Sequence, residues 1–128
     1  MNPGVGQWKD ALIDIDRDVE FTGDDVDRYS KIVDLGGVYE NIEVKLPTIT
    51  GSVVQAYGQQ GNGLTEVPLP INIFDADATG HFAHATTTGP GGFYITFHIG
   101  GFQFIRIHTD ANQAADRTFS VRGVGRLS

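Results

Sequence analysis

The last third of the chain holds the pattern that most limits how the protein can fold. From residue 93 to residue 109, apolar residues alternate with polar or smaller ones on both sides of the pair Gly100 and Gly101. Two-residue glycine connections favour the tight turns of β-hairpins, because glycine adopts positive φ angles at little cost. The pattern therefore predicts an antiparallel hairpin in which residues 93–99 pair with residues 102–109 and one face is buried.

The register of this hairpin determines which of its side chains enter the core. A simple two-residue turn sets Arg106 opposite Ile95 and so places a charged side chain on the apolar face. If Phe104 and Ile105 together form a β-bulge, Ile107 lies opposite Ile95 instead and Arg106 turns to the other face. We therefore expect the bulge, a buried Ile107 and an Arg106 whose replacement costs little stability.

Composition extends this pattern to the whole chain. Seventeen glycines, five prolines and many Val, Ile, Thr and Phe residues are typical of short strands joined by tight turns. We expect an all-β protein, an antiparallel β-sandwich of jelly-roll type with about eight to nine strands, while a barrel stays open as the alternative. The expected strands begin near residue 12 and cover 29–35, 41–46, 52–57, 67–74, 81–86, 93–99, 102–109 and 118–124.

The chain is expected to have two parts. Residues 1–9 carry Pro3, Gly4 and Gly6 and predict a flexible N-terminal arm. Residues 10–128 are of ordinary length for one domain with a single core. The 58–63 segment, GQQGNG, is expected to be an exposed loop.

Charge restricts the partners that the protein can have. The net charge is −7, and residues 1–43 hold eleven acidic residues against four basic ones. A surface of that sign repels phosphate backbones, so we expect no nucleic-acid partner. No run of residues approaches the roughly 18 apolar residues of a membrane span, and the first residues do not resemble a signal peptide, so a soluble protein without a membrane partner is expected.

No pattern in the sequence predicts catalysis. The chain has no cysteine, which excludes thiolate chemistry, and it carries no nucleophile elbow, phosphate-binding loop or dinucleotide fingerprint. The acidic clusters at residues 24–27 and 75–77 are best explained as turns. The four histidines are not expected to converge on a metal: His81, His84, His98 and His108. We expect neither an enzyme nor a cofactor.

Two passages carry a family resemblance. They are YSKIVDLGGVYENIEVKLPTITGSVVQAYG at 29–58 and GGFQFIRIHTDANQAADRTFSVRGV at 100–124, about half of the chain. The DLGG turn, the LPTIT strand end and the closing ADRTF strand resemble small β-sandwich structural proteins of tailed phages. The resemblance implies a capsid cement or decoration protein that binds the major capsid protein outside the phage head, often as a homotrimer. Such a virion protein is assembled in the host cytoplasm.

Charge and the single tryptophan suggest where attachment takes place. Residues 10–27 hold eight acidic residues and one basic residue, which would suit a basic patch on the shell or on a neighbouring subunit. The candidate interface residues are the tryptophan, three of these acids and three arginines near the C-terminus: Trp8, Asp14, Asp16, Asp18, Arg117, Arg122 and Arg126.

A carbohydrate-binding β-sandwich module of a phage tail or fibre is the alternative function. Sugar rings stack on exposed aromatic side chains, so this function requires several aromatic residues on one surface. The sequence shows no convergence of its Trp and Tyr residues: Trp8, Tyr29, Tyr39, Tyr57 and Tyr94.

Overall fold

The protein is all-β and antiparallel. The computed structural model describes residues 4–51, 53–71, 84–85, 91–92 and 94–127, and this part of the chain contains no helix. It follows that no described helix is long or apolar enough to cross a membrane. Most of the strand expected at 81–86, with His81, and the acidic turn at 75–77 lie outside the described residues.

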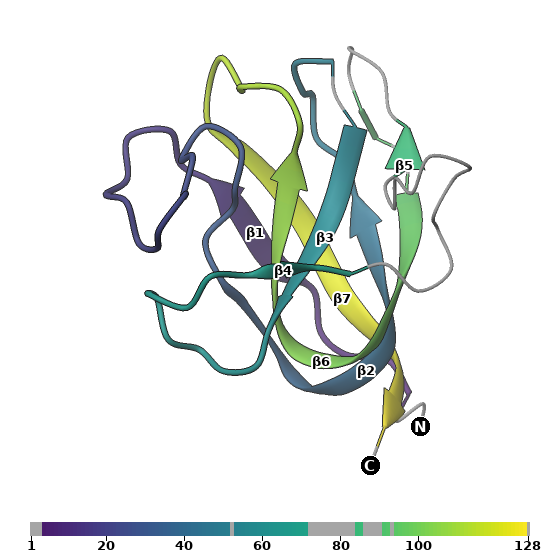
Figure 1. Ribbon diagram of the computed structural model, residues 1–128. Coiled ribbons are helices and arrows are strands. Elements are labelled where there is room, and N and C mark those ends of the chain that lie inside the picture. The colour runs from purple at the N-terminus through teal and green to yellow at the C-terminus, as the bar shows by residue number, and fades with distance from the viewer. Residues whose placement is uncertain (1–3, 52, 72–83, 86–90, 93, 128) are drawn as a thin grey trace, which may run out of the picture.

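Seven strands form one sheet across the described residues (Figure 1). They run in the order β1-β7-β2-β6-β3-β4, and β5 pairs separately with β3. Their bounds are β1 Lys9–Ile13, β2 Val33–Lys45, β3 Val53–Gln59, β4 Leu69–Pro70, β5 His84–Ala85, β6 Tyr94–Thr109 and β7 Arg117–Leu127. The two ends of this path, β1 and β4, leave the sheet open.

The predicted hairpin at Gly100 and Gly101 is wrong. These glycines have φ angles of 69° and 102°, yet they lie inside β6, which continues through them instead of folding back on itself. The halves of β6 do not pair with one another, so the bulge expected at Phe104 and Ile105 does not form within a hairpin. Both halves pair with β2, which passes in the same way through Gly36, with a φ of 80°.

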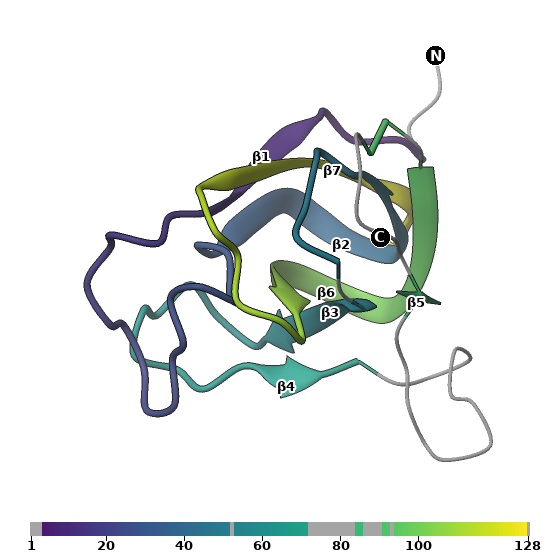
Figure 2. The ribbon, with the colours of Figure 1, turned by 90° about the horizontal axis from the view of Figure 1, so that it is seen from above.

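The two glycine sites bend one long strand pair. The β2–β6 ladder runs from Val33 opposite Ile105 to Lys45 opposite Tyr94, and its register shifts between Asp34 and Asn41. Figures 1 and 2 show both strands curving strongly through this region. Positive φ angles therefore produce a bend here and not a turn, because each strand keeps a partner on both sides of its glycines.

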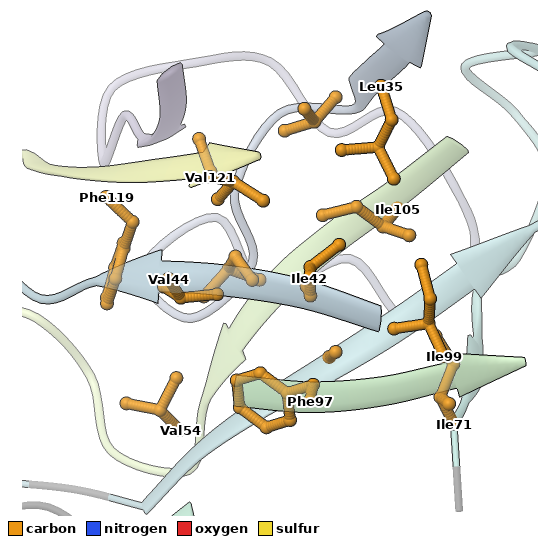
Figure 3. Packing of buried hydrophobic residues seen from close by; sticks show 14 of the residues in the cluster. Leu35, Ile42, Val44, Val54, Ile71, Phe97, Ile99, Ile105, Phe119 and Val121 are labelled. Carbon is orange, nitrogen blue, oxygen red and sulfur yellow. The ribbon is translucent and has the colours of Figure 1, made fainter. Parts of the chain in front are cut away.

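One hydrophobic core lies inside the curved sheet. It gathers buried side chains from β1, β2, β3, β6 and β7 into a single cluster (Figure 3). The predicted inward positions of Phe119 and Val121 are confirmed, and so is the burial of Ile107. The expectation of an exposed loop at 58–63 is wrong at its start, because Gly58 and Gln59 belong to β3 and are buried.

The segment before β1 lies along β7. Gly6 N donates to Gly123 O at 2.8 Å, Gly125 N donates to Gly4 O at 2.7 Å, and Val5 bridges to Val124. Whether residues 1–9 also reach a partner, as an arm would, stays a prediction.

Candidate functional site

The predicted acidic residues lie on the loop that follows β1. Asp16 and Asp18 are exposed, while Asp14 is half-buried and its Oδ1 accepts a hydrogen bond from Asp16 N at 3.0 Å. Val19 follows them with 68 % of its surface exposed, an unusual position for a β-branched apolar residue. The loop thus presents carboxylates and an aliphatic side chain together.

A buried arginine holds this loop in place from its inner side. The Arg17 guanidinium donates to both carboxylate oxygens of Asp24 at 2.7 Å, to Glu20 at 3.0 Å and to Tyr29 O at 3.1 Å. The Arg17 side chain is 5 % exposed and that of Asp24 is fully buried. A bidentate guanidinium–carboxylate pair fixes orientation as well as distance.

A second buried arginine connects the loop to the sheet. Arg106 of β6 is fully buried and donates to Glu20 at 2.8 Å, to Gln59 of β3 at 2.6 Å and to Ser30 O at 3.1 Å. Its guanidinium also lies 4.8 Å from the centre of the Phe21 ring. Arg106 and Arg17 therefore share the Glu20 carboxylate.

The expectation that Arg106 is easily replaced is contradicted by this burial. Arg106 does point away from the apolar side chains of Ile105 and Ile107, but the segment carrying Glu20 and Ser30 covers that face of β6. No local sequence pattern identifies this cover, because Glu20 lies 86 residues from Arg106.

An exposed aliphatic surface adjoins the acidic loop. Val19 and Leu64 line one hollow of about 440 Å³, together with Arg17, Asp18, Glu20, Lys31 and Thr65. Leu64 is 50 % exposed, and Val67 and Leu69 farther along the same segment are 55 % and 60 % exposed. We call Asp16, Asp18, Val19 and Leu64 the loop surface.

Trp8 lies on a separate surface that joins β7, β2 and β6. Its ring centre is 6.0 Å from that of Tyr94, with the planes inclined at 45°, and the Arg122 guanidinium lies over the indole at 4.6 Å. Arg122 also pairs with Glu43 at 2.8 Å, and Lys45 Nζ is 5.9 Å from the Tyr94 ring centre. We call these five residues the aromatic face.

The register of the sheet explains the aromatic face. Glu43 is directly opposite Arg122 on β7, and Lys45 is directly opposite Tyr94 on β6, so all four side chains leave the same side of the sheet. The N-terminal segment then lays Trp8 across Arg122. The convergence of Trp8 and Tyr94 was not visible in the sequence, because it depends on a register between distant strands.

The three C-terminal arginines do not form one basic patch. Arg117 donates to Gln113 at 3.2 Å and to Thr50 at 3.3 Å at the start of β7. Arg126 lies near the other end of β7, where its guanidinium is close to Gly37. Nine residues of strand span roughly 30 Å, so Arg117 and Arg126 do not share a surface. Arg122, between them, lies over the Trp8 ring instead.

Tyr29, Tyr57 and His108 form a further aromatic group. The His108 ring centre lies 4.4 Å from that of Tyr29 and 4.9 Å from that of Tyr57, and its Nδ1 donates to Gln55 Oε1 at 2.6 Å. Burial, followed by the charge of Arg28, lowers the pKa of His108 to about 4. Burial, followed by the neighbouring Tyr57, raises the pKa of Tyr29. Both groups therefore stay uncharged near neutral pH.

The described residues include no group of three His, Asp or Glu side chains that could hold a metal ion. Comparisons with protein-family models, with curated proteins and with solved structures find no match for this chain.

Proposed function

We propose that this protein is a virion structural protein, a capsid cement or decoration protein that binds the major capsid protein on the outside of a phage head. The observation that carries the proposal is the loop surface, where Val19 and Leu64 are at least half exposed beside the carboxylates of Asp16 and Asp18. Exposed aliphatic side chains grouped within a polar rim are typical of protein-binding surfaces.

The buried ion pairs under the loop support a binding role. Arg17 and Arg106 hold the loop by hydrogen bonds to Asp24 and Glu20, so its conformation is established before a partner arrives. A surface that is already ordered loses less conformational entropy on binding. This order supports the proposal, because an attachment surface on this loop would not have to fold first.

Charge and architecture complete the proposal. The net charge of −7, concentrated in residues 1–43, would complement a basic surface on the shell. As the family resemblance implies, the protein would act as a homotrimer on the virion exterior after assembly in the host cytoplasm. A sandwich of jelly-roll type with eight to nine strands remains the proposed architecture of the complete chain, since its sheet already curves around one core.

A decoration assay tests this proposal. Phage heads that lack the protein are mixed with the purified chain, separated on a gradient and imaged by electron microscopy. We expect wild-type protein to occupy regular positions on the shell. The double variants Val19→Ser/Leu64→Ser and Asp16→Lys/Asp18→Lys should each bind about tenfold more weakly or worse, because they remove the apolar centre or reverse the charge.

The matched control is Glu40→Lys, which reverses an exposed acid of β2 outside the loop surface and should bind like wild type. Undiminished occupancy by both double variants would place the attachment site elsewhere. Absence of wild-type protein from the shell would contradict the function itself.

A further inference from the structure

We propose that the aromatic face, composed of Trp8, Tyr94, Arg122, Glu43 and Lys45, is a binding site for a neutral oligosaccharide. This site shares no residue with the loop surface, so the inference does not depend on the decoration function. The ring pair, its polar border and its balanced charge each contribute to the argument.

The two rings provide the stacking surface. Trp8 is 43 % exposed and Tyr94 is 55 % exposed, although large aromatic side chains usually bury most of their area. Arg122 supports the Trp8 ring from one side, and the Tyr94 ring is inclined at 45° to it. Two exposed, inclined rings with centres 6.0 Å apart offer a stacking surface for the apolar face of one sugar ring.

The polar border is fixed by the sheet. The Arg122 guanidinium is held against the Glu43 carboxylate by contacts of 2.8 Å and 2.9 Å, while Lys45 extends beside Tyr94. Sugar hydroxyls both donate and accept, so one hydroxyl can donate to Glu43 while another accepts from Lys45. Donors and acceptors at the edge of a stacking ring are what hold a sugar in one orientation.

Charge selects a neutral ligand. Asp10 of β1 and Lys45 of β2 both lie opposite Ser120 of β7, so the carboxylate of Asp10 borders the same face. The two cations, Lys45 and Arg122, are therefore balanced by two anions, Asp10 and Glu43. A phosphate or a uronic acid would gain no net attraction from this face, whereas a ligand rich in hydroxyl groups needs none.

The same features disfavour a protein partner at this position. A stable protein interface buries about 800 Å² on each partner and has an apolar centre. The aromatic face offers only two rings surrounded by charged groups, while the exposed aliphatic side chains Val19 and Leu64 lie on the loop surface. An oligosaccharide matches the size and polarity of the aromatic face better.

The single tryptophan permits a direct test, because its fluorescence reports only on the proposed site. The complete chain is titrated with linear hexasaccharides of glucose, mannose, galactose and N-acetylglucosamine, and with oligogalacturonate as the acidic counterpart. We expect at least one neutral hexasaccharide to change the Trp8 emission in a saturable way, with oligogalacturonate at least tenfold weaker.

Variants then assign the binding to the two rings. Calorimetry should show that Trp8→Ala and Tyr94→Ala each weaken the neutral hexasaccharide about tenfold or more, whereas Tyr94→Phe stays within about threefold because it keeps the ring. Leu64→Ser is the control and should bind like wild type. Tyr94→Phe and wild type should unfold at comparable urea concentrations, which would show that the affinities of two folded proteins are being compared.

Three results would overturn the proposal. They are no response to any neutral hexasaccharide, tighter binding of oligogalacturonate, and undiminished binding by Trp8→Ala. A further result would assign the aromatic face to self-association instead. In that case the wild type binds no sugar, and Trp8→Ala lowers the mass in solution to that of one chain.

Discussion

The burial of Arg106 has a clear physical basis in its partners. A buried guanidinium loses its hydration, and only ion pairs and hydrogen bonds of good geometry compensate for that loss. Arg106 obtains them from Glu20, Gln59 and Ser30, within a group in which two arginines face two carboxylates. The sequence predicted which face of the strand Arg106 occupies, but not that a distant loop covers that face.

Arg106→Ser is therefore expected to be strongly destabilising. Removing the guanidinium leaves Glu20 and Gln59 without their partner, and breaking a buried pair in this way costs about 3–5 kcal/mol. Urea unfolding measures the loss. The matched control is Arg122→Ser, which breaks the half-exposed pair with Glu43 and should cost no more than about 1 kcal/mol. If both variants lost the same free energy of unfolding, burial would not explain why the Arg106 ion pair matters more than the Arg122 pair.

The lowered pKa of His108 predicts how the stability of the protein responds to acid. Its pKa is lowered to about 4 in the folded protein, by burial first, against 6.5 for an unperturbed histidine. The unfolded chain therefore takes up a proton at higher pH than the folded one, so this group's contribution to stability is present above pH 6.5. It is lost as the pH falls toward 4 and amounts to about 3 kcal/mol at most.

The measurement compares wild type with His108→Gln between pH 7 and pH 4. Because other acidic groups titrate alike in both proteins, the wild-type free energy of unfolding should fall more steeply than that of the variant. Parallel curves, or a His108 NMR titration midpoint near 6.5, would show that burial does not affect this group as described.

At the scale of the elements, the sequence predicted strands more reliably than it predicted their connections. Alternation identified the strand at 118–124 and both halves of β6 correctly. It could not separate a turn from a bend at Gly100 and Gly101, because both conformations need positive φ angles. The distinction depends on whether a strand finds a partner beyond the glycines. That partner is β2, some 60 residues away.

Gly101 is the position at which this bend can be tested. A side chain there would meet Leu127 and Val38 only at ordinary contact distances of 3.4 Å and 3.6 Å, so the cost of substitution comes mainly from the φ of 102°. We expect Gly101→Val to lose about 2 kcal/mol and Gly101→Asn to lose less, because asparagine tolerates positive φ better. Equal urea midpoints for Gly101→Val and wild type would contradict a bend in β6 that requires a positive φ at this position.

At the scale of the whole molecule, the sequence identified the acidic segment at residues 10–27 but not the loop after β1 that carries Asp14, Asp16 and Asp18, nor the side chains around them. Val19 and Leu64 meet at one hollow although 45 residues separate them, and Trp8 reaches Tyr94 through the register of three strands. Arg117 and Arg126 are close in sequence but lie near opposite ends of β7. Proximity along a strand is a poor guide to shared surfaces, because each residue advances the chain by about 3.3 Å.

The trimer implied by the family resemblance can be tested by mass. β4 is a two-residue edge strand that includes Pro70, which has no backbone donor, so sheet extension at this edge is disfavoured and contact must use side chains. Light scattering at micromolar concentration should give three times the chain mass of 13.8 kDa. Leu69→Asp, at a position 60 % exposed, should reduce that mass. A single-chain mass for wild type would contradict a trimer in solution.

The charge of the whole molecule determines how attachment should respond to salt. With a net charge of −7 and exposed acids on the loop surface, the proposed binding to a basic shell would include a long-range attraction. That attraction extends about 10 Å at 0.1 M salt and only about 3 Å at 1 M.

We expect wild-type occupancy of phage heads to fall as the salt concentration rises. The variant Asp16→Asn/Asp18→Asn should bind more weakly than wild type at low salt, and its occupancy should depend less on salt. Since Val19 and Leu64 are unchanged in that variant, the two proteins should converge at high salt. Identical salt dependence would show that the acidic loop does not face the shell, and attachment would then have to rest on another surface of the sheet.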